Sequence, residues 1–337
     1  MVPPEFRLVN WILQNLPNTK YDLSSSGLPP PQLEEMGVDP SYKRFLQEKG
    51  DHEGLLAKTV AGLYDVDASN VVITTGGSEA IYLAYSVFWK GKAVVPLPNY
   101  EPMFAIPRWL GMKVTSSLAS PPVRGAVYGV TDPNNPTGSR LRSEVGLLEE
   151  ASRRATVFVN ETYGGFTFES PHSAFSDHRQ FVTCTSMTKF YGLGWLRVGW
   201  MLANKKNAEL LQKGRRLISG HNSEYSLWIA KQVLARRDAF VRRARMIHAG
   251  NIELVREFAS SVKGAVVVPS EAAPFCLVRY SKKSDSVTFA ENLLREQGVL
   301  VSPGDYFGVP RAFRLCFTSD RGDLSEGLKR LSEFLAS

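Results

Sequence analysis

The segment from Phe181 to Trp200 constrains the fold more than any other part of the chain. It begins with a β-prone run, Phe181 to Thr185, and passes through hydroxyl residues to a single lysine, Lys189. Two glycines in an aromatic setting follow, and then a second apolar run that carries Arg197. Such runs predict buried strands, and glycines between them predict a loop. We therefore expect a loop that carries Lys189 between two buried strands.

The lysine and the arginine of this loop suggest a particular chemistry. Phe190, Tyr191 and Trp195 lie close to Lys189 in the sequence. If these rings wall the lysine, partial desolvation favours the neutral amine, which can attack an aldehyde. Arg197 supplies a planar fork that suits a phosphate. Taken alone, a lysine among aromatic residues is more often one that extends along the surface to water, so this interpretation needs support from the rest of the chain.

The spacing of these residues resembles that of a known family. Ser186-x-x-Lys189, followed by Arg197-x-Gly199, is similar to the lysine segment of the class I/II aminotransferases, the aspartate aminotransferase-like enzymes of fold type I. These enzymes use pyridoxal 5'-phosphate (PLP). The resemblance implies that Lys189 is the catalytic residue that binds the cofactor's aldehyde, and that Ser186 and Arg197 bind its phosphate. It extends from Gly27 to the last helix.

The resemblance implies an α/β fold. A large domain would carry a mostly parallel, seven-stranded sheet with the ligand at the carboxyl ends of the strands. Alternating helices and strands in the C-terminal part also indicate a smaller α/β domain. We expect an N-terminal segment over residues 1–40 that forms the mouth of the site and part of the small domain. A large PLP-binding domain would occupy residues 41–230, and a small C-terminal domain residues 231–337.

Three local predictions concern the connections between these elements. Residues 223–260 predict one helix long enough to bridge the two domains. The last helix is predicted to open with Asp323 and Glu326 at capping-box spacing. After a strand around Val114, the connection to Gly125 is compact and contains Pro121 and Pro122.

The composition is that of an ordinary soluble protein. The 337 residues can bury a large core. No run of about 18 apolar residues appears, and the N-terminus from Met1 lacks the basic-then-apolar pattern of a signal peptide. We therefore expect a cytoplasmic protein without a membrane partner. The three cysteines lie far apart in apolar surroundings, which predicts buried free thiols.

The net charge of +7 raises the question of nucleic acid. The densest basic cluster, Arg236 to Arg245, falls on a helical pattern with interleaved apolar residues. This spacing predicts a solvated helix face, so we expect no nucleic-acid partner. The basic surface would also help to attract anionic substrates.

A glycine pair after a short apolar run predicts an anion site. The run that begins at Val71 leads into Gly76-Gly77-Ser78 and the start of a helix. Glycines let the backbone approach an anion, Ser78 can cap the helix, and free amides with the helix dipole favour a phosphate. Most such turns bind nothing, but this one precedes the lysine loop in the order that the family shows. The resemblance therefore implies that Gly77 and Ser78 bind the phosphate.

The remaining cofactor contacts follow from the resemblance. Tyr100 would stack on the pyridine ring. Asn135, in an Asn-Pro-Thr-Gly turn, would point its amide at the phenolate oxygen of PLP, and its prolines and glycine would hold it there. Tyr163 matches the tyrosine that donates to the same oxygen. No metal site is predicted.

One position departs from the family pattern. Three residues before Tyr163, relatives carry an aspartate that keeps the pyridine nitrogen protonated, and this chain has Asn160. Asparagine can donate to an unprotonated nitrogen or accept from a protonated one, so it enforces neither state. Glu161 should not replace the aspartate, because neighbouring strand residues point to opposite faces. Whether Asn160 leaves full activity is open at this point.

The substrate side is predicted from the two ends of the chain. The resemblance places the extended segment Tyr21 to Pro31 over the mouth of the site with the backbone at Gly27 near the substrate; a plain linker explains these residues equally well. Arg314 is a cation in an apolar strand, which structural ion pairing also explains, but the family has its substrate-carboxylate arginine there. Asn135 would also contact the substrate. Members of the family form homodimers, and Tyr42 is the candidate for the tyrosine that reaches the partner's phosphate.

The resemblance implies an aminotransferase that moves an amino group between an α-amino acid and a 2-oxo acid. Lys189 would act as the general base that moves the substrate's α-proton. A PLP lyase or decarboxylase acting on an amino acid would share every cofactor residue. A non-catalytic PLP-binding module is favoured if Asn160 reflects lost activity. The amino acid and oxo acid, and the residues of the partner subunit, cannot be identified from the sequence.

Overall fold

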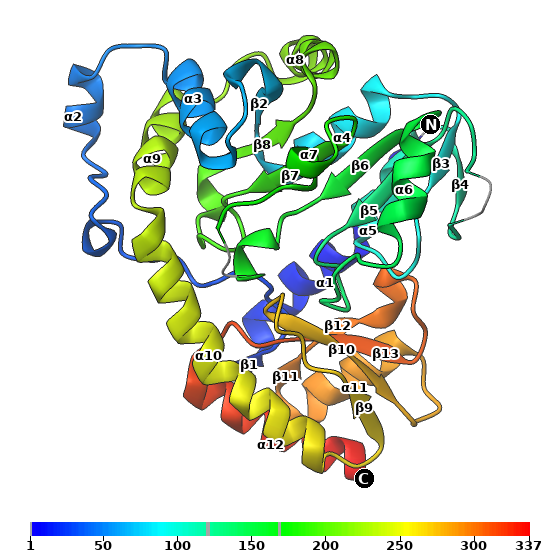
Figure 1. Ribbon diagram of the computed structural model, residues 1–337. Helices are drawn as coiled ribbons and strands as arrows, with labels where there is room; N and C mark the ends of the chain where they lie inside the picture. Colours follow the sequence, from blue (N-terminus) through cyan, green and yellow to red (C-terminus); the bar gives the residue numbers. More distant parts are fainter. Residues whose placement is uncertain (1, 119–121, 168–169) are drawn as a thin grey trace.

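Within the residues that the computed structural model describes, which are 2–118, 122–167 and 170–337, seven strands form a large sheet (Figure 1). Their order is β2-β8-β7-β6-β5-β3-β4, and β8 runs antiparallel to its neighbours while all other pairs are parallel. The predicted mostly parallel sheet is confirmed. The strands are β2 (Val71–Thr74), β3 (Lys92–Val94), β4 (Lys113–Thr115), β5 (Val127–Thr131), β6 (Thr156–Asn160), β7 (Val182–Ser186) and β8 (Gly199–Leu202).

The central strands of this sheet are apolar on both faces because helices cover both. Along β6, Phe158 packs with apolar residues of α4, α5 and α8, whereas Val157 and Val159 pack with α6. Each parallel crossover returns through a helix, so a parallel strand is buried on both sides. The helices of this part are α2 (Tyr42–Gln47), α3 (His52–Tyr64), α4 (Gly76–Val87), α5 (Glu101–Trp109), α6 (Val145–Ser152), α7 (Ala174–Asp177), α8 (Lys205–Ser219) and α9 (Glu224–Ala235).

A second, smaller layer lies below the large sheet in Figure 1. Among the described residues its sheet has the order β12-β13-β10-β9, with every pair antiparallel. Its strands are β9 (Ala265–Val267), β10 (Phe275–Tyr280), β12 (Ser302–Pro303) and β13 (Ala312–Cys316). Its helices are α1 (Arg7–Asn15), α10 (Arg237–Ser261), α11 (Ser286–Gln297) and α12 (Arg321–Ala336). The predicted limits of the two domains remain a prediction.

The N-terminal segment joins the two layers. Strand β1 (Tyr21–Asp22) pairs in parallel with β11 (Val299–Leu300) beside the small sheet. Glu101, at the start of α5 and 2% exposed, accepts hydrogen bonds from Arg7 Nε and from the backbone N–H of Leu8. Six short 3₁₀ turns complete the described secondary structure: Leu16–Asn18, Glu34–Met36, Ala68–Asn70, Gly164–Thr167, Gly194–Leu196 and Gly304–Phe307.

Three helix predictions were wrong in detail. The predicted helix over 223–260 is two helices, α9 and α10, which meet at Arg236, where φ is −111° and ψ is 18°. The last helix begins at Arg321 with Asp320 as its N-cap, because the Asp320 side chain accepts from Gly322 N, so no capping box forms at Asp323 and Glu326. Helix α4 begins at Gly76, so Ser78 is inside its first turn and is not its N-cap.

Other sequence expectations have mixed outcomes. All three cysteines are free and buried, as expected. Two arginines of the basic cluster do not extend freely into water: Arg236 Nε donates to the Gly37 carbonyl and Arg243 Nη2 to the Pro29 carbonyl, so this helix face binds the N-terminal segment. No described helix is long and apolar enough to cross a membrane. Met1 and Pro121, on which two expectations rested, lie outside the described residues.

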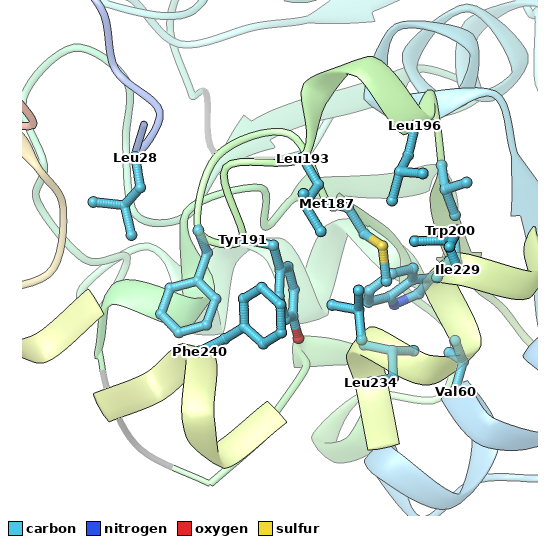
Figure 2. Packing of buried hydrophobic residues seen from close by; sticks show 14 of the residues in the cluster. Leu28, Val60, Met187, Tyr191, Leu193, Leu196, Trp200, Ile229, Leu234 and Phe240 are labelled. Carbon is cyan, nitrogen blue, oxygen red and sulfur yellow. The ribbon is translucent and has the colours of Figure 1, made fainter. Parts of the chain in front are cut away.

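The loop over residues 187–198, here called the lysine loop, is fixed by its apolar side chains. Figure 2 shows Met187, Leu193 and Leu196 in the hydrophobic cluster that also holds residues of α9 and α10. The loop also folds back on itself, because Leu193 N donates to the Met187 carbonyl. Gly192 has φ of +71°, and a Cβ at this position would lie 2.5 Å from the Pro29 carbonyl oxygen. The lysine loop therefore packs directly on the N-terminal segment.

Gly192→Ala should lower the free energy of unfolding by at least about 1–2 kcal/mol, because a left-handed backbone is costly for a residue with a Cβ and the new atom would meet backbone. Gly62→Ala is the matched control. Gly62 is exposed inside α3 with nothing within 4 Å of an added Cβ, so this change should raise stability by about 0.5–1 kcal/mol. Urea unfolding of both variants measures the difference, and equal stabilities would contradict the packing described.

Candidate active site

The predicted site residues gather at one edge of the large sheet. The strands β2, β5, β6 and β7 run in the same direction, and their carboxyl ends lead directly to Gly76, Asn135, Asn160 and Lys189. Open α/β sheets bind ligands at this edge, because the connections after neighbouring strands converge there. The sheet topology therefore explains why residues far apart in the sequence meet.

The side chain of Lys189 reaches toward the N-terminal segment. Its Nζ donates to Ser26 Oγ over 3.2 Å, and Tyr163 donates from its hydroxyl to the same Ser26 oxygen over 2.8 Å. A Cβ on Gly27 would lie 3.4 Å from Lys189 Cδ, so the backbone passes very close to the lysine. Ser26 thus brings Lys189 and Tyr163 together. The sequence analysis missed Ser26, although alternation along an extended segment places Ser24 and Ser26 on one side.

The aromatic residues near Lys189 do not wall it as expected. Phe190 meets the Phe166 ring edge-on at 5.5 Å, and Tyr191 meets Phe240 at 5.6 Å. Both side chains are buried in the cluster of Figure 2, whereas Trp195 is 53% exposed. The rings of Phe190 and Tyr191 therefore anchor the lysine loop to the 3₁₀ turn Gly164–Thr167 and to α10 instead of enclosing the amine.

Four residues that lie close together are called the phosphate cradle here: Gly76, Gly77, Ser186 and Arg197. A Cβ on Gly76, which has φ of +77°, would lie 2.9 Å from Arg197 Nη2, and one on Gly77 would lie 3.8 Å from Ser186 Oγ. The cradle stands at the first turn of the twelve-residue helix α4, where unpaired amides and the helix dipole favour an anion. Arg197 is exposed and donates to the Thr75 carbonyl at 3.4 Å.

The cradle differs in two ways from the sequence prediction. Gly76 and not Gly77 is the glycine on which Arg197 lies, and the left-handed φ of Gly76 was the signal that the sequence alone could not supply. Ser78 is exposed, one residue farther along the first turn of α4. Its backbone amide remains at the end of the helix that faces the cradle.

Arg314 is a buried cation at the side of the site. It is 2% exposed, with its guanidinium carbon 5.3 Å from the centre of the Phe275 ring and 5.0 Å from that of Phe307. Its Nη1 donates to Asn135 Oδ1 and its Nη2 to the Ser24 carbonyl, each over 2.9 Å. Its Nε is buried without a partner among the described residues. None of the ion pairs in the described part of the chain includes Arg314, so structural ion pairing does not explain it.

Two further predicted site residues, Asn135 and Tyr100, lie near Arg314. Because Asn135 Oδ1 accepts from Arg314, the amide hydrogens of Asn135 are directed to a different acceptor. Tyr100 precedes α5, and its ring meets Phe6 edge-on at 5.8 Å. Burial raises the pKa of the Tyr100 phenol, Tyr163 adds to this effect, and Arg314 opposes it, so Tyr100 stays neutral within reach of both.

Asn160 and Glu161 face opposite sides of the sheet, as strand alternation predicts. Asn160 lies next to Cys184 and Met103. Glu161 is held instead by Ala174 N at 2.6 Å and Ser173 Oγ at 2.7 Å, at the start of α7. Burial raises the pKa of the Glu161 carboxyl to about 7, while these hydrogen bonds oppose the shift. Glu161 therefore does not contact the face on which Asn160 lies.

Comparisons with known proteins agree with this geometry. The model of the family "Aminotransferase class I and II" matches residues 34–331. Capreomycidine synthase of Streptomyces vinaceus is 26% identical, covering 99% of this chain and 94% of the relative. Aspartate aminotransferase of Streptomyces avermitilis is 25% identical, covering 88% and 83%. The fold is that of a PLP-dependent aminotransferase from Streptococcus suis, with a TM-score of 0.87 at 24% identity, covering 100% and 98%.

The chain therefore belongs to the class I and II aminotransferase family, and it is an enzyme of that family. Membership implies PLP as the cofactor. The residues present fit this group, because Arg197, Ser186 and the first turn of α4 lie close together and Lys189 lies at the same edge of the sheet. The unpaired Nε of Arg314 is a second sign of a ligand with acceptor oxygens.

Arg314→Ala should weaken the binding of a substrate carboxylate by roughly 1.5–3 kcal/mol with little change in PLP content, because a charge-assisted pair is lost far from the cradle. Arg197→Ala should do the reverse. Arg314→Lys, which keeps the charge but not the fork, is the control for loss of charge. Cofactor absorbance and the Kd for an amino donor measure the two effects. Equal loss of cofactor in both alanine variants would show that the division of roles is incorrect.

Glu161 should make stability depend on pH. Its folded pKa of about 7 lies above the ordinary 4.5, so its contribution is fully present below pH 4.5 and is lost as the pH rises through 7. The loss is at most about 3 kcal/mol. Glu161→Gln keeps the acceptor oxygen but cannot ionise, so its free energy of unfolding relative to wild type should rise between pH 4.5 and pH 8. Urea unfolding at the two pH values measures this, and a constant difference would refute it.

Proposed function

We propose that this enzyme is a PLP-dependent aminotransferase that moves an amino group between an α-amino acid and a 2-oxo acid. The observation that carries the proposal is the position of the Lys189 amine. It shares the Ser26 hydroxyl with Tyr163 and lies at the same sheet edge as the phosphate cradle. Arg314, on β13 of the small sheet, reaches this edge through its hydrogen bond to Asn135. An amine between an anion cradle and a carboxylate-binding arginine suits a substrate that has both a reacting amino carbon and a carboxylate.

The cofactor would be held by groups at the carboxyl ends of β2, β3, β5, β6 and β7, together with Arg197 before β8. Arg197, Ser186 and the amides of Gly77 and Ser78 bind the phosphate. The amide of Asn135 and the hydroxyl of Tyr163 donate to the phenolate oxygen, Tyr100 stacks on the ring, and Asn160 binds its nitrogen. When bound, PLP withdraws electrons from the bonds at the substrate's amino carbon. This assignment follows the resemblance. It is supported by Arg314 Nε, which has no partner among the described residues, and by the bond from Arg314 to Asn135 Oδ1, which leaves the Asn135 amide hydrogens for another acceptor.

Arg314 would orient the substrate. Its guanidinium has neutral partners on Nη1 and Nη2, and its flat faces are covered by Phe275 and Phe307. A buried cation without a counterion is costly, and a bidentate carboxylate relieves this cost. The backbone at Gly27 lies against the lysine and limits the space above it. The carboxylate would therefore be held on one side of Lys189.

Lys189 would move the proton. As a free amine it would be the base, and the Ser26 hydroxyl gives it a hydrogen-bonding partner that is itself bound to Tyr163. General bases of this kind must lie within hydrogen-bonding reach of the proton that they take. Oriented binding by Arg314 brings the α-carbon to this position.

We further propose that the enzyme is a cytoplasmic homodimer, as the resemblance implies. Tyr42, Leu46 and Trp195 are each more than half exposed, so covering them in a subunit interface would remove apolar surface from water. Tyr42 remains the candidate for a contact with the partner subunit's phosphate. No nucleic acid or membrane is proposed as a partner.

A second reaction class has one supporting observation. A relative that covers nearly the whole chain is a synthase and not an aminotransferase. A lyase, decarboxylase or synthase would use the same cofactor residues and differ in the bond that Arg314 aligns. Product analysis after one turnover separates the classes, because transamination alone leaves the aminated cofactor in equal amount to the oxo acid. A non-catalytic PLP-binding module would give neither product.

Borohydride reduction of the PLP-loaded protein should place the label on Lys189, because this lysine alone among the described residues reaches Ser26 and Tyr163 at the strand edge. Peptide mapping by mass spectrometry measures the position. Lys189→Arg keeps the charge but cannot bind the aldehyde, so it should carry no label. A label on any other lysine would end the proposal.

A further inference from the structure

The carboxamide of Asn160 can satisfy its neighbours in one orientation only. The backbone N–H of Thr162 donates to Oδ1 over 3.2 Å, and the Thr162 hydroxyl donates over 2.6 Å. The Cys184 thiol adds a third donor at 3.7 Å, and burial raises its pKa so that it keeps its proton. A backbone N–H can only donate, so the oxygen and not the NH₂ group of Asn160 must face Thr162.

The amide nitrogen of Asn160 is left nearly without a partner. The residue is 4% exposed, and within the part of the chain that the structure describes the partner found for Nδ2 is the Met103 sulfur at 4.0 Å. A thioether is a weak acceptor, and a carboxamide nitrogen has two hydrogens to donate. A buried donor without an acceptor is unfavourable. The nitrogen therefore points to a place where a ligand's acceptor belongs.

The position of Asn160 relative to the cradle identifies that acceptor. Thr162 Oγ1, which binds Asn160, lies 3.6 Å from the position of a Cβ on Gly77. Asn160 is thus one side chain away from the cradle. In PLP the ring nitrogen lies across the ring from the carbon that carries the aldehyde. A ring with its phosphate on the cradle and its aldehyde at Lys189 turns its nitrogen away from the lysine and toward Asn160.

We propose that Thr162 is a positioning residue that holds the Asn160 carboxamide with its NH₂ group toward the PLP ring nitrogen, so that Asn160 acts only as a donor and the ring stays unprotonated. This inference rests on the proposed function. The amino-acid sequence allows Asn160 either to donate to an unprotonated ring nitrogen or to accept from a protonated one, and this inference excludes the second state. A nitrogen that accepts a hydrogen bond uses the lone pair that a proton would need.

The consequence concerns electron withdrawal. An aspartate at this place would hold a proton on the ring nitrogen through its negative charge, and a protonated ring is the stronger electron sink. Here the ring is neutral at the nitrogen, so removal of the substrate's α-proton depends more on Lys189 and on the alignment that Arg314 gives. Replacing Asn160 with aspartate should reverse the protonation.

The test uses PLP labelled with ¹⁵N in the ring. The wild-type protein and the variants Thr162→Ser, Thr162→Val and Asn160→Asp are loaded with it, and the ¹⁵N chemical shift is read by NMR. Thr162→Ser keeps the hydroxyl and Thr162→Val matches the size without it. Wild type and Thr162→Ser should show the shift of an unprotonated pyridine nitrogen. Asn160→Asp should show that of a protonated one, and Thr162→Val should lie between them.

Two controls separate this inference from the proposed function. Borohydride mapping to Lys189 is performed on each loaded sample. If wild type carries the label on Lys189 but shows a protonated nitrogen, the inference is wrong and the proposed function stands. If Lys189 carries no label, the proposed function is wrong, and the inference falls with it.

The Thr162 variants decide the role of that residue. A shift of Thr162→Val equal to that of wild type and Thr162→Ser would overturn the positioning role. If Thr162→Val does not take up PLP, Thr162→Ala is used in the same comparison. The rate of the first half-reaction gives a second measurement by stopped flow. Asn160→Asp should raise it about 10- to 100-fold, and an unchanged or lower rate in a loaded variant would contradict the proposal.

Discussion

The buried guanidinium of Arg314 is the constraint on which the rest of the site depends. It has three neutral oxygen partners and two aromatic neighbours but no described carboxylate, so the protein holds a positive charge that is only 2% exposed. Such a charge is tolerated because three separate pieces of chain supply its surroundings: the N-terminal segment through Ser24, the turn after β5 through Asn135, and β13 itself. In the function proposed here, the substrate carboxylate would be the anion that completes this arrangement.

The sequence predicted the parts of the site that follow from local chemistry. Lys189, Arg197 and the glycines at the start of α4 each lie in a recognisable pattern, because a strand end, a glycine turn and a helix start each affect the choice of a few neighbouring residues. The mostly parallel sheet followed from the family resemblance and is confirmed. The role of Arg314 could also be predicted only from the resemblance, since an arginine in an apolar strand has several explanations.

The residues that the sequence did not reveal are those whose roles depend on distant contacts. Ser26 is one serine among three, and only the fold brings it to Lys189, 163 positions away. Thr162 follows the end of β6, and only the structure shows that its two donors fix the amide of Asn160. The prediction that the aromatic residues beside Lys189 wall its amine was wrong. Residues that are adjacent in sequence need not place their side chains on the same side of a loop. The break at Arg236 was invisible to periodicity, since apolar spacing continues across it.

The N-terminal segment has a consequence for the order of folding. Residues 21–28 bond to β11, to the lysine loop and to Arg314, across separations that reach 290 positions between Ser24 and Arg314. Contacts of such sequence separation form slowly, because a long loop must close before they stabilise the chain. During synthesis the first strand of this protein therefore leaves the ribosome long before its partners exist. The bonds that residues 21–28 make with β11 and Arg314 form only after these C-terminal strands have been made.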